Sequence, residues 1–140
     1  MLMDVLAGVV AGLVMAGVFL AAAVFFLFTH RDTYDRLAKR LPRGLSPTAL
    51  LLVILFGLPP VWGLAGAVGG LLYHLADSSH PGKGLASPNF WFTLAVLCLA
   101  ALAVLVMLVV RRRPDPFGLA IAVAFAGIFG WLLPFLATWR

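Results

Sequence analysis

Long apolar runs alternate with short polar connectors along the whole 140-residue chain. Four of these runs are long enough for a membrane-spanning helix, which needs about 20 apolar residues. The spans are predicted at residues 5–28, 48–73, 90–110 and 117–138. The pattern therefore predicts an all-α integral membrane protein whose four transmembrane helices form one domain over residues 1–140.

Three of the four spans begin with the same local signal. Ser46-Pro47, Ser87-Pro88 and Asp115-Pro116 each place a capping side chain before a proline at the edge of an apolar run. Such a side chain can accept a hydrogen bond from a free N–H group of the first turn, and proline fits the first helical position. These pairs predict where the second, third and fourth helices start.

Composition explains why lipid must surround much of this chain. Hydrophobic residues make up 64% of it and charged residues 11%, against about 45–50% and about 25% in soluble domains. A chain this short cannot hide so much apolar surface in its own core. The net charge of +5 lies mostly in the connectors, so nucleic acid is not expected as a partner.

The basic residues predict which way the spans run. Eight of the ten lie in the first and third connectors, and positive connectors face the cytoplasm. Both termini are then outside. The four spans form two parallel-oriented hairpins in a prokaryotic-type cytoplasmic (inner) membrane. The eight residues are Arg31, Arg36, Lys39, Arg40, Arg43, Arg111, Arg112 and Arg113.

The first connector has a further pattern over residues 32–41. Acidic residues precede basic residues by four positions, at Asp32–Arg36 and Asp35–Lys39, which favours a short amphipathic helix. Its basic face would contact anionic lipid head groups or dock a partner protein. The basic residues assigned to this contact are Arg36, Lys39, Arg40 and Arg43.

The middles of the spans lack ionisable side chains. None of the four predicted spans holds a carboxylate, lysine, arginine, asparagine or glutamine, and ion paths or relays normally need such groups. An enzyme is therefore not expected. The main hypothesis is a non-catalytic accessory or assembly subunit of a larger membrane complex, with membrane lipids and other transmembrane subunits as partners.

Pro59 and Pro60 lie near the middle of the second span. Proline removes backbone hydrogen bonds and bends helices, so a kink is predicted there. The alternative function is a small carrier or channel-like protein, with an apolar pocket at Pro59, Pro60 and Trp62 for a lipid, quinone or carotenoid. No other cofactor is expected.

Small residues recur at every fourth position in the first and fourth spans. This spacing lets two helices approach closely within a membrane, where no hydrophobic effect drives their association. The residues predicted to pack helices together are Gly118, Ala122, Ala126 and Gly130 in the fourth span, with Gly8 and Gly12 in the first.

One metal site is conceivable in the second connector. His74, Asp77 and His80 follow each other at intervals of three residues, and imidazole and carboxylate are ligands of zinc. A metal-dependent membrane enzyme is thus the third hypothesis. Interfacial histidines with a capping aspartate are the simpler interpretation, because Pro81 ends the helix and a fourth ligand is not evident.

Overall fold

The structure, a computed structural model, describes residues 1–29, 39, 47–79, 89–111 and 116–138. Four helices in it are long and apolar enough to cross a membrane, which confirms the four apolar helices expected from the sequence. They are α1 (Leu2–Thr29), α3 (Pro47–Ser79), α4 (Phe90–Arg111), and a fourth that runs as α5 (Pro116–Gly127), the π-helical η1 (Ile128–Leu132) and α6 (Leu133–Thr138).

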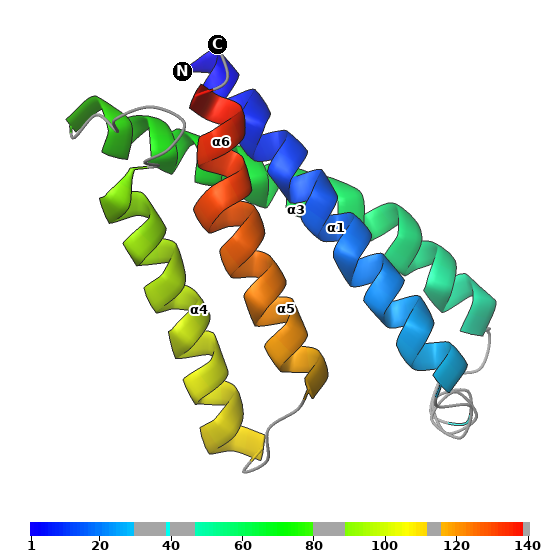
Figure 1. Ribbon diagram of the computed structural model, residues 1–140. Coiled ribbons are helices and arrows are strands. Elements are labelled where there is room, and N and C mark those ends of the chain that lie inside the picture. The colour runs from blue at the N-terminus through cyan, green and yellow to red at the C-terminus, as the bar shows by residue number, and fades with distance from the viewer. Residues whose placement is uncertain (30–38, 40–46, 80–88, 112–115, 139–140) are drawn as a thin grey trace.

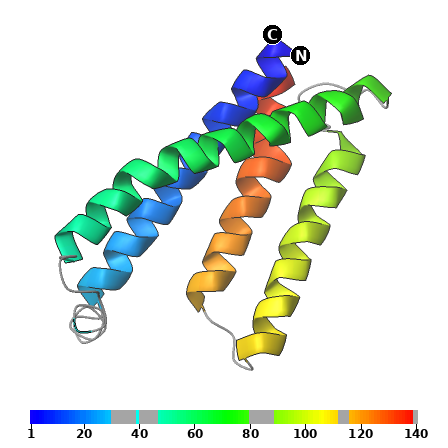
Figure 2. The ribbon, with the colours of Figure 1, turned by 180° about the vertical axis from the view of Figure 1, so that it is seen from behind.

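The helices form two pairs that diverge from one end of the molecule (Figure 1). Helices α1 and α3 lie side by side in opposite directions, and α4 lies beside α5 (Figure 2). The N-terminus and C-terminus lie together at one end, here called the termini end. The Pro116 end of α5 and the Thr29 end of α1 lie farther apart than the end of α6 and the start of α1 (Figure 1).

Glycines bring α1 and α3 together along their backbones. A Cβ atom at Gly8 would lie 2.7 Å from the amide nitrogen of Gly70, and one at Gly66 would lie 2.9 Å from the amide nitrogen of Gly12. Real Cβ atoms essentially never come so close to another atom. These four positions therefore exclude any side chain, and the two backbones are in direct contact.

Helix α1 is the central helix, because it also contacts α5, η1 and α6. Its side chains of Ala7, Ala11 and Met15 are buried against those neighbours and belong to the core cluster. Helix α4 contacts α5 and η1 but meets α3 only weakly. No residue of α5 is buried. The packing is therefore tight near the termini end and loose beyond it.

The three helix starts lie at or within one residue of the starts predicted for the second, third and fourth spans. Helices α3 and α5 begin at Pro47 and Pro116. Helix α4 begins at Phe90, where the side-chain oxygen of Asn89 accepts a hydrogen bond of 3.2 Å from the amide of Phe92. Asn89 thus caps this helix, whereas Ser87-Pro88 lies outside the described residues.

Helix α3 is longer than the predicted span and continues through Pro59 and Pro60 to Ser79. The predicted kink and the orientation of the helix pairs in a membrane remain predictions. The amphipathic segment at 32–41 lies outside the described residues except for Lys39, which is helical and exposed. Arg36, Arg40 and Arg43 also lie outside them.

Two glycines of α3 test the backbone contact. We expect Gly66→Ala to reduce the free energy of unfolding by about 1–3 kcal/mol, as overpacking does, because the added methyl group meets the backbone of α1. Gly57→Ala is the matched control, since a Cβ there has no atom within 4 Å. Unfolding in mixed detergent micelles measures both, and equal stability of the two variants would contradict the contact.

Candidate functional site

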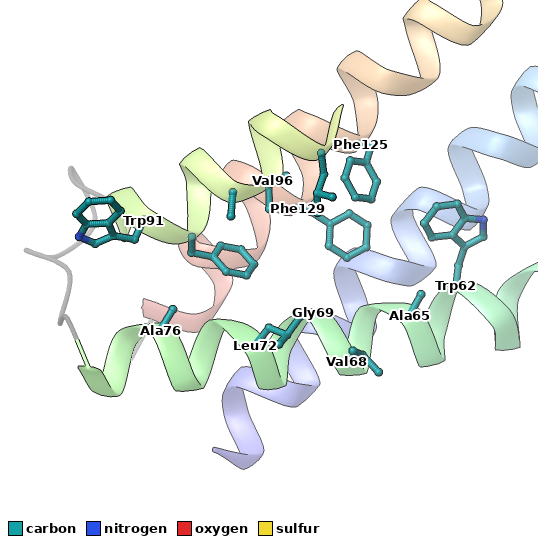
Figure 3. Close-up of a pocket in the computed structure, with 13 residues that line it drawn as sticks. Trp62, Ala65, Val68, Gly69, Leu72, Ala76, Trp91, Val96, Phe125 and Phe129 are labelled. Atoms are coloured by element: carbon teal, nitrogen blue, oxygen red, sulfur yellow. The ribbon is translucent and has the colours of Figure 1, made fainter. Parts of the chain in front are cut away.

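A large apolar cavity of about 490 Å³ lies between α3 and α4, with α5 and η1 at its back. Thirteen residues line it, as Figure 3 shows, and none of them carries a charge. Ligand pockets usually have volumes of about 300–1,000 Å³ and mostly apolar walls. Five of the lining residues are aromatic, namely Trp62, Trp91, Phe92, Phe125 and Phe129.

The large cavity is open along the side between α3 and α4. Val68 and Leu72 of α3 are 57% and 54% exposed although they line the cavity, and Leu99 of α4 is 58% exposed. An apolar chain from outside the protein can therefore reach the lining of the cavity through this opening. The lining can hold such a chain by contact, but it offers no ionisable group for a reaction.

A small cavity of about 230 Å³ continues beyond Trp62 on the side distant from the termini end. Trp62 and Phe125 line both cavities. The two cavities together are called the wedge. The other residues of the small cavity are Met15, Phe19, Ala100, Ala103, Val104, Met107, Gly118, Ile121 and Ala122.

The back wall of the wedge includes the π-helical turn η1, where the fourth helix departs from α-helical hydrogen bonding ahead of Pro134. In an α-helix the carbonyl of Gly130 would accept a bond from the N–H of residue 134, but Pro134 has none. The hydroxyl of Thr93 in α4 donates to this carbonyl at 2.9 Å. The bond joins α4 to η1, the π-helical turn that carries Phe129. π-helical turns of this kind are frequent at functional sites.

Space for Phe129 comes from a glycine of α3. A Cβ at Gly69 would lie 3.3 Å from the Phe129 ring, closer than nine in ten real contacts. Gly69 therefore lets the ring approach α3. On the other side of the same turn, the hydroxyl of Thr93 donates a hydrogen bond to the carbonyl of Gly130.

A polar pair joins α1 to α3 at the termini end. The buried carboxylate of Asp4 lies 2.8 Å from Nδ1 of His74, although 70 residues separate them. The same oxygen lies 2.8 Å from the N-terminal ammonium of Met1. The adjacent Tyr73 is 1% exposed and packs edge-on against Phe92, with 5.2 Å between ring centres.

The residues predicted for an apolar pocket are only partly brought together. Trp62 lines both cavities, whereas the described lining of α3 begins at that residue, two positions after Pro60. Pro59 is half-buried and Pro60 is exposed. The large cavity therefore extends from Trp62 toward the termini end, away from the proline pair. The pocket predicted at Pro59 and Pro60 remains a prediction.

The predicted metal ligands take different positions. His74 uses Nδ1 for Asp4, while Asp77 follows one turn later in α3 and His80 lies outside the described residues. Within the described ranges, no group of three or more His, Cys, Asp or Glu side chains could hold a metal ion.

The small residues of the two predicted stripes also have different roles. Gly8 and Gly12 lie at the backbone contact of α1 with α3. Gly118 and Ala122 line the small cavity, and Gly130 faces the side chains of Thr93 and Val96 in α4. Ala126 is half-buried between these regions. Gly130 thus lies at a helix contact, whereas Gly118 and Ala122 line the wedge.

Sequence reasoning missed Asp4, Thr93 and Pro134 as organising residues. Asp4 and Thr93 form hydrogen bonds with partners that are 70 and 37 positions away in the sequence. The local spacing of residues therefore does not predict either bond. Pro134 was a usable signal, because a proline inside an apolar run leaves a carbonyl that needs another donor.

No protein-family model, curated protein or solved structure matches this chain.

A double-mutant cycle tests how Thr93 supports the wedge. We expect Thr93→Val to reduce the unfolding free energy by about 1 kcal/mol, the usual size of such a bond between membrane helices. In a Pro134→Ala background the loss should be smaller, because the new N–H can bond to the Gly130 carbonyl. Unfolding in mixed micelles gives both values, and equal losses in the two backgrounds would contradict this role.

A second cycle tests the pair at the termini end. We expect His74→Phe to destabilise the protein by about 1–3 kcal/mol, because the buried carboxylate of Asp4 loses a partner. Adding Asp4→Leu should recover part of the loss, since the buried carboxylate that lost its imidazole partner is then removed as well. Thermal unfolding in detergent measures the series. A double variant that is less stable by the sum of the single losses would contradict the pairing.

Proposed function

We propose that this protein is a non-catalytic membrane protein that binds one long apolar chain, such as the tail of a lipid or quinone, in its wedge. The observation that carries the proposal is the large cavity, whose volume of about 490 Å³ is enclosed by uncharged residues and opens between α3 and α4. A polar substrate would find no charged partner among the thirteen lining residues.

The shape of the wedge favours a chain over a compact molecule. Its lining follows successive turns of α3 from Trp62 to Ala76, which is an elongated path along the helix. Aromatic rings at the back offer large flat surfaces for contact. Because lipid tails are as apolar as the cavity, selectivity must come from close packing against these rings.

A second candidate function is a subunit of a membrane complex, and α4 favours it. Of its side chains, only those of Phe92, Val96 and Ala100 are buried within the described part of the chain. The remaining face is apolar and meets few other elements of the protein. A transmembrane helix of a partner could cover this face.

Two substitutions in α4 distinguish these functions. Ala95→Phe puts a ring into the large cavity, and we expect it to reduce the hydrocarbon-chain lipid that co-purifies by about tenfold, the effect of overpacking by about 1.4 kcal/mol. Ala101→Phe is the matched control on the exposed side of α4, outside the residues that line the wedge. The measurement is solvent extraction of protein purified in mild detergent, followed by mass spectrometry.

The results of this measurement distinguish lipid binding in the wedge from a role as a subunit of a complex. Equal retention by the two variants, or no retained lipid in the unmodified protein, would contradict the binding function. A membrane protein that co-purifies in fixed ratio and is lost from the Ala101→Phe variant would instead support the subunit.

A further inference from the structure

Four aromatic rings form a row across the wedge, from α1 through α3 to the fourth helix. The ring of Trp62 lies 5.3 Å from Phe19 and 6.3 Å from Phe129, and Phe129 lies 4.9 Å from Phe125, measured between ring centres. In Figure 3 the labelled rings of Trp62, Phe129 and Phe125 stand at the same end of the large cavity, opposite Trp91. The row is named here by these four residues, Phe19, Trp62, Phe129 and Phe125.

This aromatic row is the boundary between the two cavities. Phe129 lines the large cavity and Phe19 lines the small one, whereas Trp62 and Phe125 line both. Beyond the row, the small cavity adds about 230 Å³ of equally apolar space. A chain that enters between α3 and α4 therefore meets the indole of Trp62 before it can reach the small cavity.

Trp62 is held in this position by its neighbours. Contacts between aromatic rings are favourable beyond the area they bury, and Trp62 takes part in ring pairs with both Phe19 and Phe129. Moving the indole aside would disrupt both pairs. Trp62 therefore keeps a fixed position between the two cavities. Neither cavity is lined by a charged group or a hydroxyl group that could replace the lost ring contacts if the indole moved.

We infer that Trp62 determines the length of the apolar chain that the wedge retains, by closing the large cavity against the small one. The inference rests on the proposed binding function and names the residue that sets its specificity. Chains that fit between Trp91 and Trp62 are retained in full contact. Longer chains must leave their last methylene groups outside, where those groups gain nothing from the protein.

The test uses delipidated protein in detergent micelles and a series of unbranched saturated fatty acids of increasing length, with retention measured by native mass spectrometry. We expect retention by the unmodified protein to stop rising beyond a certain chain length. In Trp62→Ala that limit should move to longer chains. Methylene groups that enter the opened space gain packing contact with its walls, so retention of those longer chains should rise severalfold relative to the unmodified protein.

Two further variants separate a specificity role from a purely structural one. Trp62→Phe keeps a smaller ring, so its limiting chain length should lie between those of the unmodified protein and Trp62→Ala. This variant also allows the test if Trp62→Ala does not fold. Trp131→Ala removes an exposed tryptophan that stacks on Phe135 outside the wedge lining, and its limit should not move.

The results also distinguish the inference from the function on which it rests. Retention with the same length limit in the Trp62 variants and the unmodified protein would overturn the role of Trp62 and leave the binding function standing. No retention of any chain by the unmodified protein would overturn both.

Discussion

The contact between the backbones of α1 and α3 is the constraint on which the other packing depends. Four glycines leave no room for a side chain between these helices, so Gly8 and Gly12 lie directly against the chain near Gly66 and Gly70. Within lipid, close van der Waals contact of this kind is a main source of helix association. With α3 held on one side, α1 can present Ala7, Ala11 and Met15 to the fourth helix on the other.

The wedge follows from the uneven distribution of such contacts. Near the termini end, Thr93 bonds to the carbonyl of Gly130 and Asp4 pairs with His74, so each helix pair is fixed there. Helix α4 meets α3 only weakly, and the large cavity lies between these two helices, beside the bond of Thr93. The small cavity lies farther from the termini end, where α5 has no buried residue.

Polar groups in this protein have structural roles that can be traced to backbone chemistry. The hydroxyl of Thr93 donates to the carbonyl of Gly130 in the π-helical turn that precedes Pro134, where an unsatisfied carbonyl would be costly within lipid. The side chain of Asn89 satisfies an amide at the start of α4. Neither group lines the wedge. Its surface therefore provides shape and contact for a ligand, while the few polar atoms maintain that shape.

The sequence by itself determined the number of helices, most of their boundaries and their apolar surroundings. Those properties depend on local composition, on the length of each apolar run and on proline at helix starts such as Pro47 and Pro116. It also indicated Gly8 and Gly12 as small residues with a packing spacing, and Trp62 as a member of an apolar pocket.

Only the tertiary structure decided which faces meet. Asp4 pairs with His74, and Thr93 with Gly130, across many intervening residues. Gly118 and Ala122 line a cavity although their spacing matches that of a packing stripe. The reason is physical: in a chain that is apolar on nearly every helical face, hydrophobic periodicity does not distinguish a face in contact with another helix from a face in contact with lipid. The partners of each face are then set by steric fit and by a few polar bonds between distant parts of the chain.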